Sequence, residues 1–216
     1  MPQADTILAM FEAMREALGP SRWWPGDTPF EIAIGAILTQ NTNWRNVEKA
    51  IANLKAENLL DAEALHGLPL PRLAELIRPA GYFNIKARRI ANFLNFLKDE
   101  AEYDLESLKD MPLDEIRPKV LAVNGIGPET ADSILLYALD FPTFVVDAYT
   151  ARMMGRHGLA WEDIDYHQLQ AIFMDALPQD VAVYNEYHAL IVRVGKDWCK
   201  KKAGLCDTCP LKPFLE

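Results

Sequence analysis

Cysteine, basic charge and long apolar runs are all scarce in this 216-residue sequence. Three cysteines, an odd number, argue against the disulfide framework that stabilises small secreted domains. No apolar run reaches the roughly 18 residues that a membrane-spanning helix needs, and no basic-then-apolar leader follows Met1. We therefore expect a cytoplasmic protein that has no membrane partner.

Lysine and arginine number 22 against 31 acidic residues, so the formal net charge is −9. Affinity for a nucleic-acid backbone comes largely from cationic side chains, so this charge disfavours a nucleic-acid binder unless basic residues are segregated. Two clusters are segregated along the chain: Lys86, Arg88 and Arg89, and a C-terminal set of Arg193, Lys196, Lys200, Lys201 and Lys202. Solvated helix faces are the alternative explanation for both clusters.

Hydrophobic residues make up 50% of the chain, enough to bury a core, and their spacing is helical almost throughout. The first helix has an apolar face, with Asp5 as its expected N-cap and Gly19 as its end. No segment shows the alternation that is typical of strands, so we predict an all-α fold. Further helices are expected over residues 30–38, 44–55, 71–78, 84–98, 113–120, 128–139, 148–157, 166–177 and 181–194.

The stretch from residue 121 to residue 147 is the most informative part of the chain. A helix ending near Val120, a turn that holds Gly125 and Gly127, and a helix starting at Pro128 predict a helix-hairpin-helix. We expect the N–H groups of this turn and the positive end of the following helix to accept a phosphate oxygen. An ordinary turn between helices is the alternative, because Gly-x-Gly alone is a weak signal.

With Asp147 one helix length downstream, this stretch resembles the helix-hairpin-helix/GPD superfamily of DNA glycosylases. The resemblance extends from Phe30 to Cys209. It is closest to the endonuclease III-related branch that includes the third type of 3-methyladenine glycosylase, which shares phrases such as Gly35-Ala36-Ile37-Leu38-Thr39-Gln40-Asn41-Thr42. The resemblance implies a two-domain, all-α fold with a DNA-binding cleft between the domains.

The same resemblance implies where the two domains divide. Residues 1–23 and 142–216 would form a terminal helical domain with a cysteine-containing C-terminal loop. Residues 24–141 would form a helical barrel domain that contains the hairpin. The implied partner is double-stranded DNA with a damaged base, bound by a monomer.

Asp147 stands where the family places its catalytic aspartate. Once the base has been flipped out of the duplex, a fixed carboxylate can stabilise an oxocarbenium-like sugar or activate a water. An N-cap for the helix starting at Ala148 would also explain Asp147. The two roles are compatible, because helix N–H groups keep a carboxylate ionised.

Glu129 stands two residues after the second hairpin glycine, where bifunctional family members carry a lysine that forms a Schiff base. A carboxylate cannot form an imine, so we predict a monofunctional glycosylase, acting on an alkylated purine, with Glu129 as a structural residue near the helix dipole. One alternative is an endonuclease III-like glycosylase and lyase acting on oxidised pyrimidines. Another is a non-catalytic DNA-binding module, which would need neither Asp147 nor Gln40.

Four residues are candidates for the base pocket. Gln40 matches the glutamine that family members insert into the gap left by the flipped base, although a polar loop residue is the alternative. Trp24 and Trp44 could form an aromatic wall for a cationic methylated purine, and Tyr149 could line the same pocket. Core packing would equally account for each tryptophan.

The hairpin residues Gly125, Ile126 and Gly127 are the expected contacts to the DNA backbone, together with Lys200 and Lys201 from the C-terminal loop. We expect Gly127 to approach a phosphate closely and to adopt a positive φ angle.

Cys199-x6-Cys206-x2-Cys209 resembles the C-terminal iron-sulfur loop of endonuclease III relatives, in which a fourth cysteine follows. Leu215 stands at that fourth position here. The resemblance implies a [4Fe-4S] site with three of its four cysteine ligands, which is degenerate, is completed by another ligand, or belongs to a chain that is cut short. Zinc bound by three thiolates and three unrelated thiols are the alternatives.

Overall fold

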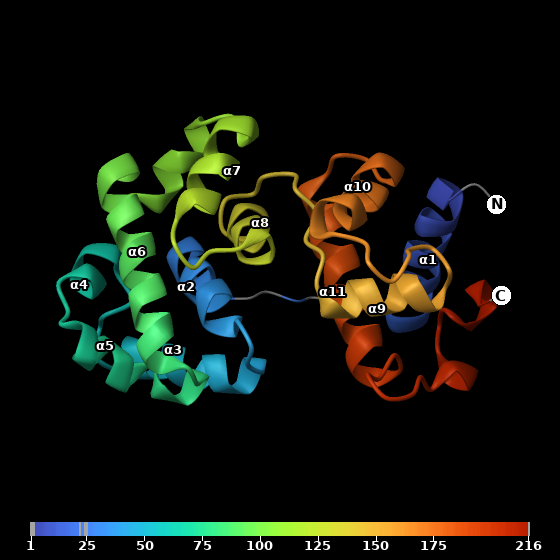
Figure 1. The fold of residues 1–216 in the computed structure, drawn as a ribbon, viewed down its shortest axis with the longest axis horizontal. Helices are drawn as coiled ribbons and strands as arrows, with labels where there is room; N and C mark the ends of the chain where they lie inside the picture. The colour runs from blue at the N-terminus through green and yellow to red at the C-terminus, as the bar shows by residue number, and fades with distance from the viewer. Residues whose placement is uncertain (1–2, 22, 24–25, 216) are drawn as a thin grey trace. The chain divides into compact units, whose positions relative to one another are not determined.

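The computed structural model describes residues 3–21, 23 and 26–215, and it confirms the all-helical fold (Figure 1). Over these residues no β-strand forms, and the extended pairing consists of one antiparallel bridge between Cys199 and Gly204. None of the helices in this part of the chain is long and apolar enough to cross a membrane.

The chain divides into two compact units. The contiguous unit is Trp24–Phe141, and the terminal unit combines Met1–Trp23 with Pro142–Glu216. The helices described in the contiguous unit are α2 (Pro29–Thr39), α3 (Trp44–Ala56), α4 (Ala62–His66), α5 (Leu70–Leu76), η1 (Arg78–Ala80), α6 (Phe83–Ala101), η2 (Leu105–Asp110), α7 (Leu113–Ala122) and α8 (Pro128–Tyr137). Those described in the terminal unit are α1 (Gln3–Leu18), α9 (Ala148–Arg156), α10 (Tyr166–Ala176), α11 (Val181–Asp197), η3 (Cys206–Thr208) and η4 (Lys212–Phe214).

Helix α2 forms the centre of the contiguous unit, because it is apolar on nearly every side. Ile32, Ile34 and Ile37 are buried, and the helix packs against α3, α6 and α8. Each fully buried isoleucine contributes about 1.5–3 kcal/mol of hydrophobic stabilisation. Thr28 starts the helix by accepting a 3.1 Å hydrogen bond from the Glu31 amide at its side-chain oxygen. The residues that follow α2 are therefore carried on a rigid support.

Helix α1 joins the terminal unit by packing against α10 and α11. The Tyr187 hydroxyl of α11 donates a 2.8 Å hydrogen bond to the Ile7 carbonyl, and the Phe11 and Tyr187 ring centroids are 4.8 Å apart. Because α1 begins at Gln3, Asp5 lies in its first turn, so the expectation that Asp5 is the N-cap is wrong. Its carboxylate there interacts favourably with the helix dipole.

Helix α4 was not expected from the sequence, because five residues are too few to show helical periodicity. Asp61 caps it by accepting a 2.9 Å hydrogen bond from the Ala64 amide. The helix expected over residues 71–78 ends earlier, at Leu76, and the chain continues as the short 3₁₀ turn η1. These corrections move element ends and leave the helical fold class unchanged.

Candidate functional site

The turn between α7 and α8 depends on one of its two glycines. Gly125 has a φ of +94°, and a Cβ built there would lie 2.4 Å from Cγ of Arg89. Gly127 has a φ of −90°, and nothing lies within 4 Å of a Cβ built on it. The expectation of a positive φ at Gly127 is therefore wrong, and the left-handed residue of the hairpin is Gly125.

The outward side of the hairpin is formed by Gly127 at the N-terminus of α8. Ile126 is buried, and its amide donates a 3.0 Å hydrogen bond to the Val123 carbonyl inside the turn. Gly127 is exposed and is the N-cap of α8, and Pro128 occupies the first helical turn. No side chain caps this helix start. Its first N–H groups are therefore arranged as in a helix N-terminal anion site.

Gln40, directly after α2, holds the hairpin from the inner side. Its amide nitrogen donates to the Gly125 carbonyl at 3.1 Å and to the Thr130 hydroxyl at 2.9 Å. Its amide oxygen accepts a hydrogen bond from the Arg89 guanidinium of α6. Insertion of Gln40 into DNA, which stays a prediction, would require these bonds to break first.

Lys86 of α6 is buried and does not belong to a solvated or DNA-facing cluster, so its grouping with Arg88 and Arg89 is wrong. Its ammonium donates to the Leu38 carbonyl at 2.8 Å and to the Ala80 carbonyl at 2.7 Å. Burial, together with the nearby Arg89 charge, lowers the pKa of Lys86 to about 8. This side chain fixes the end of α2 just before Gln40.

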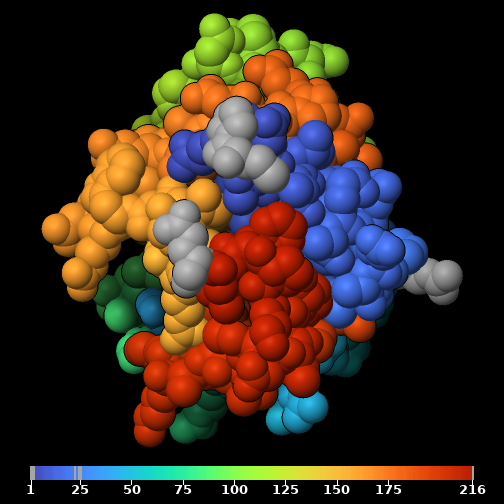
Figure 2. Space-filling model, turned by 90° about the vertical axis from the view of Figure 1, so that its right-hand side faces the viewer, coloured from blue at the N-terminus to red at the C-terminus, as the bar shows by residue number. Residues whose placement is uncertain are grey.

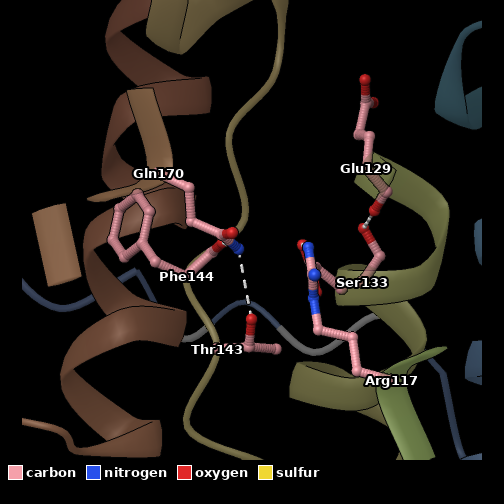
Figure 3. A network of polar contacts seen from close by, with 7 residues as sticks. Arg117, Glu129, Ser133, Thr143, Phe144 and Gln170 are labelled. Carbon is pink, nitrogen blue, oxygen red and sulfur yellow. Dashed lines mark hydrogen bonds and ion pairs between the residues drawn. The ribbon is translucent and has the colours of Figure 1, made fainter. Parts of the chain in front are cut away.

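A buried ion pair joins the two helices of the hairpin. Arg117 of α7 donates two hydrogen bonds, of 2.7 and 3.0 Å, to Asp132 of α8, whose side chain has no exposed area. On the same helix, the Ser133 hydroxyl donates a 2.7 Å hydrogen bond to the Glu129 carbonyl (Figure 3). The Glu129 carboxylate points away from Ser133, and the residue is exposed. The position at which the resemblance places a nucleophilic lysine is therefore an exposed carboxylate.

Asp147 is the N-cap of α9. One carboxylate oxygen, Oδ1, accepts hydrogen bonds from the Thr150 amide at 2.8 Å and the Thr150 hydroxyl at 2.9 Å. The other oxygen, Oδ2, lies 3.7 Å from Nε2 of His188 on α11. Burial raises the pKa of Asp147, but His188 and Thr150 outweigh this effect, and the pKa falls below its ordinary value. Asp147 is therefore a fixed and ionised carboxylate at neutral pH.

The segment that precedes Asp147 is held by α10. The Gln170 amide donates to the Thr143 hydroxyl at 3.2 Å and to the Phe144 carbonyl at 2.6 Å (Figure 3). The Phe144 ring stacks on the Phe173 ring with centroids 4.3 Å apart. Hydrogen bonds and packing together fix the backbone that carries Asp147, without regular secondary structure.

The aromatic candidates have different surroundings. Trp24 lies outside the described residues. Trp44 is half-buried on α3, and its ring is 3.5 Å from a Cβ built on Gly35 of α2. Tyr149 packs so closely on Gly195 of α11 that a Cβ there would lie 2.3 Å from its ring. Each of the two described rings is thus positioned by a glycine in a neighbouring helix.

The three cysteines and Leu215 line one small cavity of about 20 Å³ after α11. Figure 2 shows this C-terminal segment, in red, beside the light-orange chain around α9. Arg156 of α9 donates a 3.2 Å hydrogen bond to the Cys199 sulfur. Burial raises the pKa of the Cys209 thiol, and the neighbouring Cys199 and Cys206 raise it further. The three cysteines of the motif therefore line the same cavity.

The donor set at this cavity fits a four-ligand cluster only in part. Three thiols are present, and the fourth position is the apolar Leu215. Across residues 3–21, 23 and 26–215, no three His, Cys, Asp or Glu side chains are close enough together to hold a metal ion. Lys200 and Lys201 in this loop are exposed, as a phosphate contact requires.

Sequence reasoning missed three residues of these sites: Thr150, His188 and Arg156. Thr150 could have been found, because a threonine three residues after an N-cap aspartate is a capping pattern. His188 lies 41 positions after Asp147 on another helix, and nothing in the sequence linked them. Arg156 reaches Cys199 across a comparable separation.

Comparison with known proteins places this arrangement in a family. Residues 34–179, more than half of the chain, match the family model described as HhH-GPD superfamily base excision DNA repair protein. The chain belongs to this HhH-GPD superfamily. A protein of Methanocaldococcus jannaschii, provisionally named a DNA repair glycosylase, is 47% identical over 211 residues, which cover 97% of this chain and 96% of that protein. The HhH-GPD protein described here is a DNA glycosylase.

Other HhH-GPD relatives are more distant. Endonuclease III of Sulfolobus acidocaldarius is 25% identical over 87% of this chain and 81% of its own length. A crystal structure of H. pylori 3-methyladenine DNA glycosylase bound to 1,N6-ethenoadenine has a TM-score of 0.78 and 27% identity, covering 91% of this chain and 98% of that one. A trapped endonuclease III–DNA covalent intermediate, 22% identical with a TM-score of 0.85 over 100% of this chain and 97% of that one, shares the fold.

Proposed function

We propose that this HhH-GPD glycosylase removes an alkylated purine from double-stranded DNA by hydrolysis, with Asp147 as its catalytic carboxylate. The observation that carries the proposal is the state of that carboxylate. Two hydrogen bonds from Thr150 fix Oδ1, the pKa lies below its ordinary value, and Oδ2 is not held by the helix cap. A fixed negative charge is what an oxocarbenium-like transition state requires.

In the proposed reaction, the bond between C1′ and the purine nitrogen breaks, and its electron pair leaves with the base. The positive charge that develops at C1′ faces the Asp147 carboxylate. Water then adds to C1′, and the proton it loses goes to that carboxylate. An alkylated purine already carries a positive charge, so it leaves as a neutral molecule and needs no acid from the protein.

The substrate class rests on this charge argument and on the relatives. The H. pylori glycosylase, 27% identical, is named for 3-methyladenine and holds an ethenoadenine base. In the protein described here, we propose that Trp24, Trp44 and Tyr149 stack against the flipped base and that Gln40 fills the gap it leaves. A cationic purine gains from such stacking more than a neutral pyrimidine does.

We propose a monofunctional enzyme, because the residue at the position of the lyase lysine is Glu129. The alternative is an endonuclease III-like glycosylase and lyase acting on oxidised pyrimidines. The similarity to the Sulfolobus endonuclease III supports this alternative. Borohydride treatment separates the two proposals. No covalent adduct with abasic DNA should form, since a carboxylate makes no imine. An efficiently trapped complex would establish the lyase and require a different amine.

The DNA backbone would be held by Gly127, on the outward side of a hairpin that Gly125 and Ile126 shape, and by the exposed Lys200 and Lys201. The cysteine loop would keep these lysines in place. We propose that the loop binds a labile [4Fe-4S] cluster through Cys199, Cys206 and Cys209, and that it supplies nothing to the base-release step.

The test of the catalytic proposal is base release from duplexes that each carry one lesion, measured for the wild type and for Asp147→Asn. The variant should lose roughly two to four orders of magnitude in rate while DNA affinity stays nearly constant. Asp165→Asn is the matched control, because Asp165 caps α10 with the same reciprocal capping box. Equal rates for Asp147→Asn and the wild type would remove Asp147 from the mechanism.

A further inference from the structure

The two oxygens of Asp147 have different neighbours, and the difference points to a residue that the proposed function does not yet include. Oδ1 accepts both hydrogen bonds from Thr150, so the helix cap fixes that oxygen. Oδ2 faces Nε2 of His188 at 3.7 Å, the separation of an ion pair and longer than a hydrogen bond. The orientation of the second oxygen is therefore set from α11, outside the helix that carries Asp147.

His188 is itself held in place. It is buried, with 7% of its surface exposed, in a stretch of α11 where Tyr187, Ala189 and Leu190 are also buried. Helix α11 packs closely on α9 because Gly195 leaves room for the ring of Tyr149. A buried imidazole on a packed helix has few other rotamers available, so it keeps its position relative to the carboxylate.

His188 also acts on the protonation of Asp147. Burial raises the pKa of the carboxyl, and the opposing effects come from His188 and from the two bonds of Thr150. Arg152 of α9 lies nearby in sequence, but its guanidinium donates to the Cys199 carbonyl at 2.8 Å and to the Ala148 carbonyl at 3.2 Å. The imidazole of His188 therefore offsets the cost of burying the carboxylate, together with the hydrogen bonds from Thr150.

We propose that His188 is a positioning residue for base excision: it directs Oδ2 of Asp147 and keeps the carboxylate ionised in its buried site. The proposal rests on the catalytic role proposed for Asp147. A directed and ionised Oδ2 faces the developing charge at C1′, whereas a carboxylate that turns or takes up a proton loses this interaction. His188 acts through Asp147 and needs no contact with the DNA.

The first test compares binding to two duplexes, one with a neutral tetrahydrofuran and one with a cationic pyrrolidine in place of the target sugar. The ratio of the two affinities reports the negative charge at Asp147, and it does not depend on the fraction of protein that is folded. His188→Leu should lower the preference for the cationic duplex, and His188→Gln, which keeps an N–H donor, should restore most of it. Tyr187→Phe is the matched control, because it removes the neighbouring buried hydrogen bond to Ile7 and leaves Asp147 untouched.

The second test is the rate of base release as a function of pH. We expect His188→Leu to lower the rate by roughly 10- to 100-fold, by analogy with loss of a group that orients a metal ligand. In His188→Leu the acid limb of the profile should also move to higher pH, because the carboxyl takes up a proton more readily without the imidazole. Tyr187→Phe should leave the limb where it is, even if it lowers thermal stability.

Asp147→Asn, measured on the same two duplexes, separates the possible failures. If Asp147→Asn keeps the wild-type preference for the cationic duplex, the proposed function itself fails. If Asp147→Asn loses the preference and His188→Leu retains it with an unmoved acid limb, the role of His188 is refuted and that of Asp147 stands. Loss in both variants, with rescue by His188→Gln, is the expected result.

Discussion

The two glycines of the hairpin should separate protein stability from DNA binding. A residue other than glycine at Gly125 must adopt a φ of +94°, and strained backbone of this kind costs about 1–3 kcal/mol. The added Cβ would also lie 2.4 Å from Cγ of Arg89, so that side chain must move away from Gln40. A lost hydrogen bond to a charged group adds about 1.5–3 kcal/mol. We expect Gly125→Ala to lower the free energy of unfolding by about 2.5–6 kcal/mol.

Gly127 should behave in the opposite way. Its φ of −90° suits any residue, and the space around its Cβ is open. Gly127→Val should therefore change the free energy of unfolding by no more than about 0.5 kcal/mol. It should weaken DNA binding, because a branched side chain would stand between a phosphate and the first N–H groups of α8.

Urea unfolding at 25 °C measures the first effect, and affinity for undamaged and damaged duplexes at one salt concentration measures the second. The loss of affinity in Gly127→Val should be similar for both duplexes. The reasoning is refuted if Gly125→Ala is as stable as the wild type, or if Gly127→Val unfolds as easily as Gly125→Ala. A binding defect confined to damaged DNA would instead place the hairpin near the base pocket.

Three further predictions concern buried charge and the thiols. Asp132→Asn should lower the free energy of unfolding, measured in urea, by about 3–5 kcal/mol, because it removes the buried negative charge that pairs with Arg117. The double variant Arg117→Met with Asp132→Leu should recover part of that loss. Equal stability of the wild type and both variants would contradict this prediction. Lys86 loses its proton near pH 8 in the folded chain and near pH 10.5 in the unfolded chain. Between these pH values the unfolded chain binds more protons, so the free energy of unfolding should rise with pH more in the wild type than in Lys86→Met. Anaerobically purified protein should contain stoichiometric iron and sulfide that Cys206→Ser loses, whereas zinc, or an active protein without metal, would rule out the cluster.

The sequence was sufficient for the fold class and for most helices, because apolar residues recur at helical spacing over segments of about ten residues or more. It was insufficient where local pattern is weak. Helix α4 is too short for periodicity, and the boundaries at Gln3 and Leu76 depend on packing that the sequence does not display. The prediction that Lys86 belongs to a basic cluster is wrong for the same reason. A lysine in a helix is usually a surface residue, and the sequence does not show the two carbonyl groups that bind this one in the interior.

The candidate site could also be predicted only in part. Asp147 and the two hairpin glycines could be located because each lies in a contiguous motif. Which glycine has the positive φ could not be predicted, because both fit a turn and only the position of Arg89 distinguishes them. His188 could not be predicted at all, because its relation to Asp147 arises from the packing of α11 on α9.

The composition of the terminal unit from two distant chain segments also affects how the protein folds during synthesis. Helix α1 is synthesised long before Tyr187, whose hydroxyl binds the Ile7 carbonyl and whose ring packs on Phe11. The contiguous unit, by comparison, has all of its residues once Phe141 has emerged. Domains generally fold as units in the order of synthesis, so the apolar face of α1 must wait without its partners while more than a hundred residues are added. Slow translation of that interval, or a chaperone that covers α1, would therefore have most effect on the unit that carries Asp147.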